Sequence, residues 1–190
     1  MSTTPDISLH FRTVLRELEG TLAAIPAEQV EQLAQRILSA RKIFTAGAGR
    51  SGLMAKALAM RLMQLGLDAY VVGETVTPRA GEGDLLIISS GSGETQGLKI
   101  MADKAVQAGV ALAAVTIFPD SYIGQKASLV VQVPGSPKDP ADKGSFETVQ
   151  PMGSLFEQTI LLLFDSLMLH LMSQKGGDTA AMFGNHANLE

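Results

Sequence analysis

The 190-residue sequence contains no cysteine, which excludes disulfide bonds, thiolate metal ligands and a cysteine nucleophile. Tryptophan is also absent and aromatic residues make up only 5%, so aromatic stacking surfaces are not expected. The 15 Lys and Arg residues are outnumbered by 19 Asp and Glu, and they form no basic tract. This charge balance argues against a nucleic-acid partner. Because the sequence also begins without a signal peptide, we expect a cytoplasmic protein.

Long hydrophobic runs are missing as well. The most apolar stretch, residues 160–172, is interrupted by Asp165 and His170 and is too short for the roughly 20 apolar residues of a membrane span. The composition, with 46% apolar and 18% charged residues, is sufficient for a sizeable core and excludes a disordered chain. We predict one domain over residues 1–190, made of N-terminal helices (1–40), an α/β core (41–133), a loop (134–149), and a C-terminal helix with its tail (150–190).

The N-terminal segment has the spacing of an amphipathic helix. Its apolar residues recur every three or four positions, at Phe11, Leu15, Leu18, Leu22 and Ile25. Pro26 interrupts this stripe, and a second helix with an apolar inner face follows. Packing within the chain is the ordinary explanation of such a stripe, and contact with a second subunit is the alternative.

Downstream, short apolar strands alternate with helices. The alternation is typical of a doubly wound α/β fold around a five-stranded parallel sheet. The last helix is apolar on most sides, so we expect it to be buried, partly between subunits. We predict strands over residues 42–46, 69–72, 84–89, 110–116 and 129–133, and helices over 51–65, 95–108 and 152–173.

Two loops rich in small residues follow the first and third predicted strands. The first runs from Gly47 to Gly52, the second from Ser89 to Thr95, and each leads into a helix. Ligands of an open parallel sheet bind beyond the carboxyl ends of its strands, and a helix N-terminus there favours an anion. We predict that the second loop binds a phosphate group, because it brings four hydroxyls to one helix start, from Ser89, Ser90, Ser92 and Thr95.

Two other interpretations compete with phosphate binding. The first loop matches G-x-G-x-x-G, and Glu74 near the end of the second strand would then contact the ribose of a dinucleotide. The second loop weakens that interpretation, because a dinucleotide domain has no use for another phosphate cradle. Alternatively, the hydroxyls of the second loop only cap their helix, for which one serine would be enough.

Several segments together resemble one known family. Residues 90–95, Ser-Gly-Ser-Gly-Glu-Thr, fit the S-x-S-G-E-T signature of the SIS (sugar isomerase) domain family, and residues 49–51, Gly-Arg-Ser, fit its first loop. Residues 70–75, 150–158 and 186–190 are similar to the branch that converts 3-hexulose 6-phosphate to fructose 6-phosphate in the ribulose monophosphate pathway of formaldehyde fixation. The resemblance extends over nearly the whole chain.

The resemblance implies a single SIS domain with flavodoxin-like strand order, a homotetramer, and active sites built between subunits. We expect Glu94 to order its loop or to bind a sugar hydroxyl, and Arg50 to contact phosphate or hydroxyl groups. The residues that the resemblance assigns to the sugar phosphate are Gly49, Arg50, Ser51, Ser90, Ser92, Gly93, Glu94 and Thr95.

An isomerisation through an enediol needs a base that moves a proton between adjacent carbons. The chain has no cysteine and only three histidines, so it is poorly equipped for metal assistance, and we expect neither a metal nor a cofactor. The first candidate for the base is Glu157, which matches the position from which SIS isomerases draw their glutamate. An exposed acid at a helix N-terminus is the alternative for this residue.

His186 is the second catalytic candidate, because a histidine can act as acid or base near neutral pH. SIS aldose isomerases take a histidine from a neighbouring subunit for ring opening, and His186 matches that residue by role only. A surface histidine is the competing interpretation. His170 is expected to be a packed histidine of the last helix. Lys138 and Lys143 lie in the long loop and could close over the ligand, although a solvated charged loop is the ordinary interpretation.

The leading prediction is a metal-free isomerase that binds a small sugar phosphate and forms a tetramer. The tetramer is expected because the first and last helices each offer an apolar surface for a two-fold contact. One alternative is an SIS isomerase that acts on a pentose or heptose phosphate. Another is a sugar-phosphate-binding module without catalysis, although such modules usually accompany a DNA-binding domain and the sequence shows none.

Overall fold

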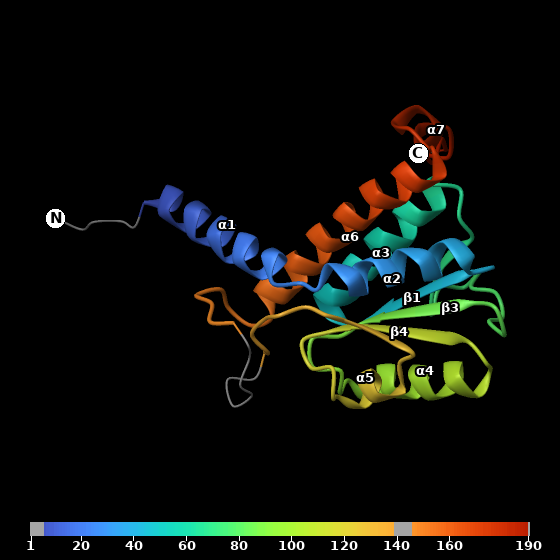
Figure 1. The fold of residues 1–190 in the computed structure, drawn as a ribbon, viewed down its shortest axis with the longest axis horizontal. Helices are drawn as coiled ribbons and strands as arrows, with labels where there is room; N and C mark the ends of the chain where they lie inside the picture. Colours follow the sequence, from blue (N-terminus) through green and yellow to red (C-terminus); the bar gives the residue numbers. More distant parts are fainter. Residues whose placement is uncertain (1–5, 139–145, 190) are drawn as a thin grey trace.

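The computed structural model describes residues 6–138 and 146–189, and a five-stranded parallel sheet lies at its centre (Figure 1). The predicted doubly wound fold is confirmed, and every strand agrees with its predicted range to within one residue at each end. The strands lie in the order β2 (Ala69–Val71), β1 (Ile43–Gly47), β3 (Leu85–Ser89), β4 (Ala111–Thr116) and β5 (Leu129–Gln132).

Helices cover both faces of the sheet (Figure 1). On one face lie α2 (Ala27–Ser39), α3 (Gly49–Gln64) and α6 (Ser154–Lys175), and on the other lie α4 (Gln96–Gln107) and α5 (Tyr122–Lys126). Successive side chains of a strand point to opposite faces, so the apolar run of β3 contributes to both layers. Leu85 and Ile87 belong to the core under α2, α3 and α6, whereas Leu86 and Ile88 belong to the core under α4.

The first helix, α1 (Ile7–Ala23), projects away from the sheet (Figure 1). Its C-terminal part packs against α6, and Leu18 is buried there. Phe11 and Leu15, from the other half of the predicted stripe, are 61% and 66% exposed. Within the described residues, this half of the stripe therefore has no packing partner.

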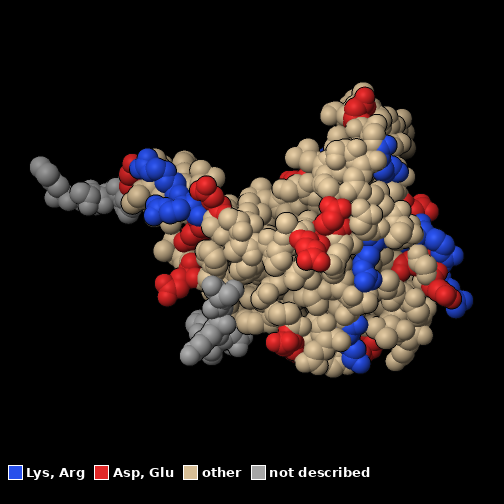
Figure 2. Space-filling model, viewed as in Figure 1, with Lys and Arg blue, Asp and Glu red and all other residues tan. Residues whose placement is uncertain are grey.

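The last long helix, α6, begins and ends two residues later than predicted. Its length of 22 residues and its hydropathy would suffice to cross a membrane by composition alone. However, 56% of its most apolar window is buried inside the molecule, as in the core helix of a folded domain. On the described part of the face in Figure 2, basic and acidic side chains are interspersed, and broad areas carry neither.

The predicted loop between β5 and α6 is described at its two ends only. Residues 134–138 and 146–148 contain neither helix nor strand, as expected. The remainder, including Lys143, lies outside the described residues. The polar tail forms a short helix, α7 (Thr179–Gly184), whose start is capped by the side chain of Asp178.

Candidate active site

The two glycine- and serine-rich loops meet at one edge of the sheet. The ends of β1 and β3 are neighbours, because Gly47 pairs with Ser89 in the parallel register. The strand order reverses direction at this point, and such a switch point is where open α/β sheets bind ligands. The structure thus brings the first loop and the second loop side by side at the expected place.

The glycines of the first loop are explained by close backbone contact. A Cβ atom on Gly52 would lie 2.6 Å from the carbonyl oxygen of Gly47, so α3 can approach β1 only without side chains here. Gly49, the first residue of α3, has φ = +58°, which favours glycine. Backbone packing and the positive φ angle of Gly49 therefore explain why glycines stand in the G-x-G-x-x-G pattern, without a dinucleotide. Glu74, the candidate ribose ligand, instead forms an ion pair with Lys56 at 2.8 Å.

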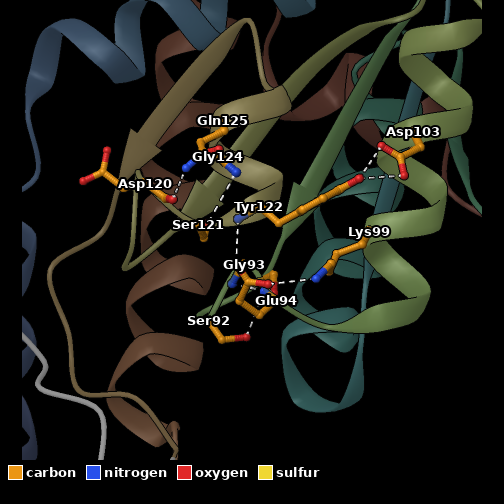
Figure 3. Close-up of polar contacts among 11 residues, drawn as sticks. Ser92, Gly93, Glu94, Lys99, Asp103, Asp120, Ser121, Tyr122, Gly124 and Gln125 are labelled. Carbon is orange, nitrogen blue, oxygen red and sulfur yellow. Dashed lines mark hydrogen bonds and ion pairs between the residues drawn. The ribbon is translucent and has the colours of Figure 1, made fainter.

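The second loop is held in shape by the segment around α5 (Figure 3). Gly93 has φ = +64°, and a Cβ atom there would lie only 1.9 Å from Ser121 Oγ. The carbonyl of Gly93 accepts a hydrogen bond from the backbone N–H of Ile123 at 3.1 Å. Gly93 therefore shapes the loop by its backbone, and it permits a contact that any side chain would prevent.

Glu94 also faces α5 (Figure 3). Its Oε1 accepts a hydrogen bond from the backbone N–H of Tyr122 at 2.7 Å, and its Oε2 pairs with Lys99 Nζ at 3.0 Å. The Tyr122 N–H and then Lys99 hold the pKa of Glu94 below its usual value. Tyr122 is fixed in turn, since its hydroxyl donates to Asp103. This geometry favours the loop-ordering role among the two expected for Glu94.

A cavity of about 270 Å³ opens between the two loops. Two hydroxyl groups of its lining are not engaged by other groups of the described part of the chain. Ser89 Oγ is buried without a hydrogen-bond partner, and Thr95, the N-cap of α4, makes no side-chain capping bond. The helix-cap interpretation thus fails for Thr95. The cavity is lined by Ala48, Gly49, Ser51, Ser89, Ser90, Gly91, Ser92, Thr95, Leu98, Ile117, Ser136, Pro137, Lys138, Gly153 and Phe156.

Two further hydroxyls of the second loop organise its backbone. Ser90 Oγ accepts from the N–H of Gly93 and Ser92 Oγ from the N–H of Glu94, each at 3.2 Å. A hydroxyl that accepts such a bond still has its own proton to donate. The lining therefore offers several neutral donors beside the start of α4, where the helix dipole also favours an anion.

Glu157 lies in the first turn of α6 and is only 3% exposed, so the expected alternative of an exposed acid is wrong. Its Oε2 pairs with Arg50 Nη1 at 2.9 Å and its Oε1 with Lys138 Nζ at 3.2 Å. Arg50 also donates to Ser154 Oγ at 3.0 Å. Two cations thus balance a buried carboxylate, as a buried charge requires.

Lys138 connects this charged cluster to the cavity. It lines the cavity, whereas Arg50 and Glu157 do not, and its Nζ reaches the Glu157 carboxylate. Sequence reasoning gave Lys138 no definite role. The available signal was its place in the long loop between β5 and α6, which does not reveal a contact with α6.

His186 does not reach this cavity within the chain. Its ring stacks on Phe183 and lines a second cavity with residues of α6 as far along as Met172. Met172 follows Glu157 by 15 residues, or about 22 Å of helix at 1.5 Å per residue. His170 is also not packed as expected: it is partly exposed, and its Nε2 lies 2.7 Å from Glu31.

The segment before α6 is tied to α1 by Glu17. Its carboxylate accepts hydrogen bonds from Thr148 Oγ1 at 2.6 Å, from Val149 N at 3.0 Å and from Gln150 Nε2 at 2.9 Å. Burial raises the pKa of Glu17, but these bonds outweigh it and leave the pKa below its usual value. Among the described residues, no group of three His, Asp or Glu side chains is arranged to hold a metal ion.

Comparison with known proteins gives consistent results. The sequence pattern of the SIS domain matches residues 36–162. The 3-hexulose-6-phosphate isomerase of Bacillus subtilis is 56% identical, over 93% of this chain and 95% of that protein. That of Mycobacterium gastri is 40% identical, over 97% and 92%. A Methanococcus jannaschii structure, reported to infer a molecular function of 3-hexulose-6-phosphate isomerase, superposes with a TM-score of 0.82 at 30% identity, over 95% and 99% of the two chains.

Proposed function

The chain belongs to the SIS domain family, and we propose that it is an enzyme that isomerises D-arabino-hex-3-ulose 6-phosphate to D-fructose 6-phosphate. The observation that carries the proposal is a cavity lined by neutral hydroxyls at the start of α4, next to a buried carboxylate with two cations at the start of α6, one of which, Lys138, reaches the cavity lining. The first suits a phosphate anchor and the second suits proton transfer. In the ribulose monophosphate pathway, this reaction follows the fixation of formaldehyde.

In this proposal the phosphate binds to the second loop, with Ser90, Ser92 and Thr95 as hydroxyl donors, and Ser51 completes the site from α3. The lining of the cavity by all four residues supports this placement, as does the unused hydroxyl of Thr95. Hydrogen bonds to a charged acceptor contribute about 1.5–3 kcal/mol each. Gly93 and Glu94 then serve the site by holding the loop.

Glu157 is the proposed base. It removes the proton from C2 of the substrate, the C2–H electrons form the C2–C3 double bond, and the C3 carbonyl oxygen takes up the negative charge. The proton of the C2 hydroxyl then passes to the C3 oxygen as the C2 oxygen becomes the new carbonyl, and the electrons of the C2–C3 double bond form a C3–H bond with the proton that Glu157 returns. Atoms and electrons balance within the substrate, so the reaction requires no external oxidant or reductant.

We propose that the enzyme is a homo-oligomer larger than a dimer, in the cytoplasm. The exposed apolar residues of α1 and the exposed Leu162 and Leu169 of α6 support two separate contacts between subunits. A catalytic role of His186 then needs a second subunit, because its own chain keeps it near the far end of α6. In that arrangement His186 would act as an acid or base beside the substrate.

A coupled assay that follows fructose 6-phosphate from 3-hexulose 6-phosphate tests the proposed function directly. We expect turnover with this substrate and unchanged activity after treatment with a chelator. Pentose and heptose phosphates serve as comparison substrates. Turnover of one of these alone would assign the chain to another SIS isomerase, and binding without turnover of any would assign it to the non-catalytic modules.

A further inference from the structure

Lys138 is a charged residue that the family resemblance does not explain, yet it lines the cavity and pairs with the buried Glu157. Resting on the proposed function, we infer that Lys138 contacts the substrate carbonyl oxygen and stabilises the negative charge that develops there. The inference rests on three features: its distance from the base, the space made for its side chain, and the neutrality of the phosphate end.

The spacing between Lys138 and Glu157 suits an enediolate. In H–C2–C3=O3, the carbon that loses its proton and the oxygen that gains charge are about 2.4 Å apart, from bond lengths of about 1.5 and 1.2 Å. A base and a cation that act on these two atoms must therefore be near neighbours. Lys138 Nζ lies 3.2 Å from Glu157 Oε1, and it also lines the cavity.

The backbone leaves room for the lysine side chain. A Cβ atom on Gly153 would lie 3.0 Å from Lys138 Cε and 3.2 Å from its Cγ, so the aliphatic stem crosses the start of α6 where no side chain stands. At the start of α3, a Cβ atom on Gly49 would lie 4.0 Å from Lys138 Nζ. Glycines thus flank the lysine on both the α6 and α3 sides, and they leave its amino group close to the base.

The second cation of the cluster is placed for a different task. Arg50 Nη1 contacts both Glu157 Oε2 and Ser154 Oγ, at 2.9 and 3.0 Å, and Arg50 is absent from the cavity lining. Arg50 therefore orients the carboxylate by holding the oxygen that Lys138 does not contact. Lys138, which is half exposed, is the charged side chain of the cluster that faces the substrate.

The phosphate end of the cavity argues against phosphate as the partner of Lys138. The described residues of that end supply hydroxyls and the start of α4, which satisfy a phosphate without a cation. A positive charge aimed at the transition state contributes most where charge develops during the reaction. We therefore expect Lys138 to affect turnover more than binding.

The experiment compares Lys138→Met with Lys138→Arg in the full-length protein. Methionine keeps the apolar stem but removes the charge, and we expect kcat to fall on the order of 10²-fold, with KM and the inhibition constant of inorganic phosphate within a few-fold of wild type. Arginine should restore a large part of kcat. Lys56→Met is the matched control, because it removes another half-exposed lysine paired with a glutamate, and it should leave kcat unchanged.

The outcomes separate this inference from the proposed function. Wild-type protein without isomerase activity would refute the function itself. Active wild type with near-normal kcat in Lys138→Met would overturn the role of Lys138 alone. A higher KM together with weaker phosphate inhibition, at unchanged kcat, would also overturn it, because Lys138 would then be a phosphate ligand. A melting curve that matches wild type establishes that the variant is folded.

Discussion

Replacing Glu157 by glutamine tests the proposed base most directly. Glutamine keeps the size of the side chain and one oxygen acceptor, but it cannot accept the proton from C2. The phosphate-binding hydroxyls lie on other segments and are not touched. We therefore expect KM within a few-fold of wild type, and a kcat lower by on the order of 10²–10⁴, or about 2.7–5.4 kcal/mol in activation free energy.

The fold should survive this change. Arg50 and Lys138 are both 52% exposed, so each can turn to water when the carboxylate is gone, and Arg50 keeps its bond to Ser154. A thermal melt checks this expectation. Glu74→Gln is the matched control, since it neutralises a glutamate that is paired with a lysine on the surface, and its kcat should equal that of wild type.

The assay is the coupled measurement of fructose 6-phosphate, repeated in deuterated solvent. Wild type should introduce deuterium at C3 of the product, the carbon of the former carbonyl, unless the base shields its proton from exchange. Near-normal kcat in a folded Glu157→Gln protein would refute the reasoning. His186 would then become the leading candidate, and His186→Asn the next variant.

Three further predictions concern binding, pH and assembly. Ser92→Ala removes one donor to the phosphate and should weaken binding of substrate and inorganic phosphate by roughly tenfold to a hundredfold, measured by calorimetry; unchanged affinity would contradict the placement. Glu17→Gln should lower the melting temperature at pH 7. Because the pKa of Glu17 is lowered by folding, this difference from wild type should shrink as the pH falls below 4.5 and through the folded-state pKa, and a constant difference would contradict the assignment. Light scattering at micromolar concentration should give a mass above that of a dimer, and Phe11→Ser with Leu15→Ser should reduce it; a wild-type monomer would exclude the tetramer.

The fold was predictable because its signals are local. Continuous apolar runs identified the buried strands. Gly66 and Gly109 directly follow the predicted helices 51–65 and 95–108, and the structure gives both the positive φ angle of a C-terminal glycine cap. The apolar stripe of α1 could be identified from its spacing. The spacing alone does not distinguish a helix packed in the core from a helix that projects away from the sheet. Only the three-dimensional structure shows that α1 leaves the sheet after Leu18, so that the outer half of the stripe is exposed.

The site was predictable in part. The loop residues that line the cavity could be identified because the ends of neighbouring parallel strands meet at one edge. The contacts of Lys138 and Ser121 could not, because they join segments that are distant in sequence and have no common motif. The contacts of His186 were also beyond sequence reasoning, since the sequence does not show which elements a short tail helix packs against. Its catalytic role stays a prediction.

The charged cluster of Glu157, Arg50 and Lys138 lies apart from the hydroxyls that bind the phosphate, and this separation affects how charge is stabilised in the proposed reaction. Before proton transfer, the charged cluster consists of one carboxylate and two cations, with a net charge of +1. After transfer, Glu157 is neutral and the substrate oxygen carries the negative charge, so the net charge of the cluster with the substrate is unchanged. The negative charge has moved only a few ångströms, from the Glu157 carboxylate to the substrate oxygen. Lys138 can contact the first before the proton transfer and the second after it. Since the cations are already in place, little reorganisation accompanies the step, which is the condition for strong electrostatic stabilisation of a transition state. A cation placed at the phosphate end would not contribute in this way, because the phosphate charge is the same before and after the proton moves.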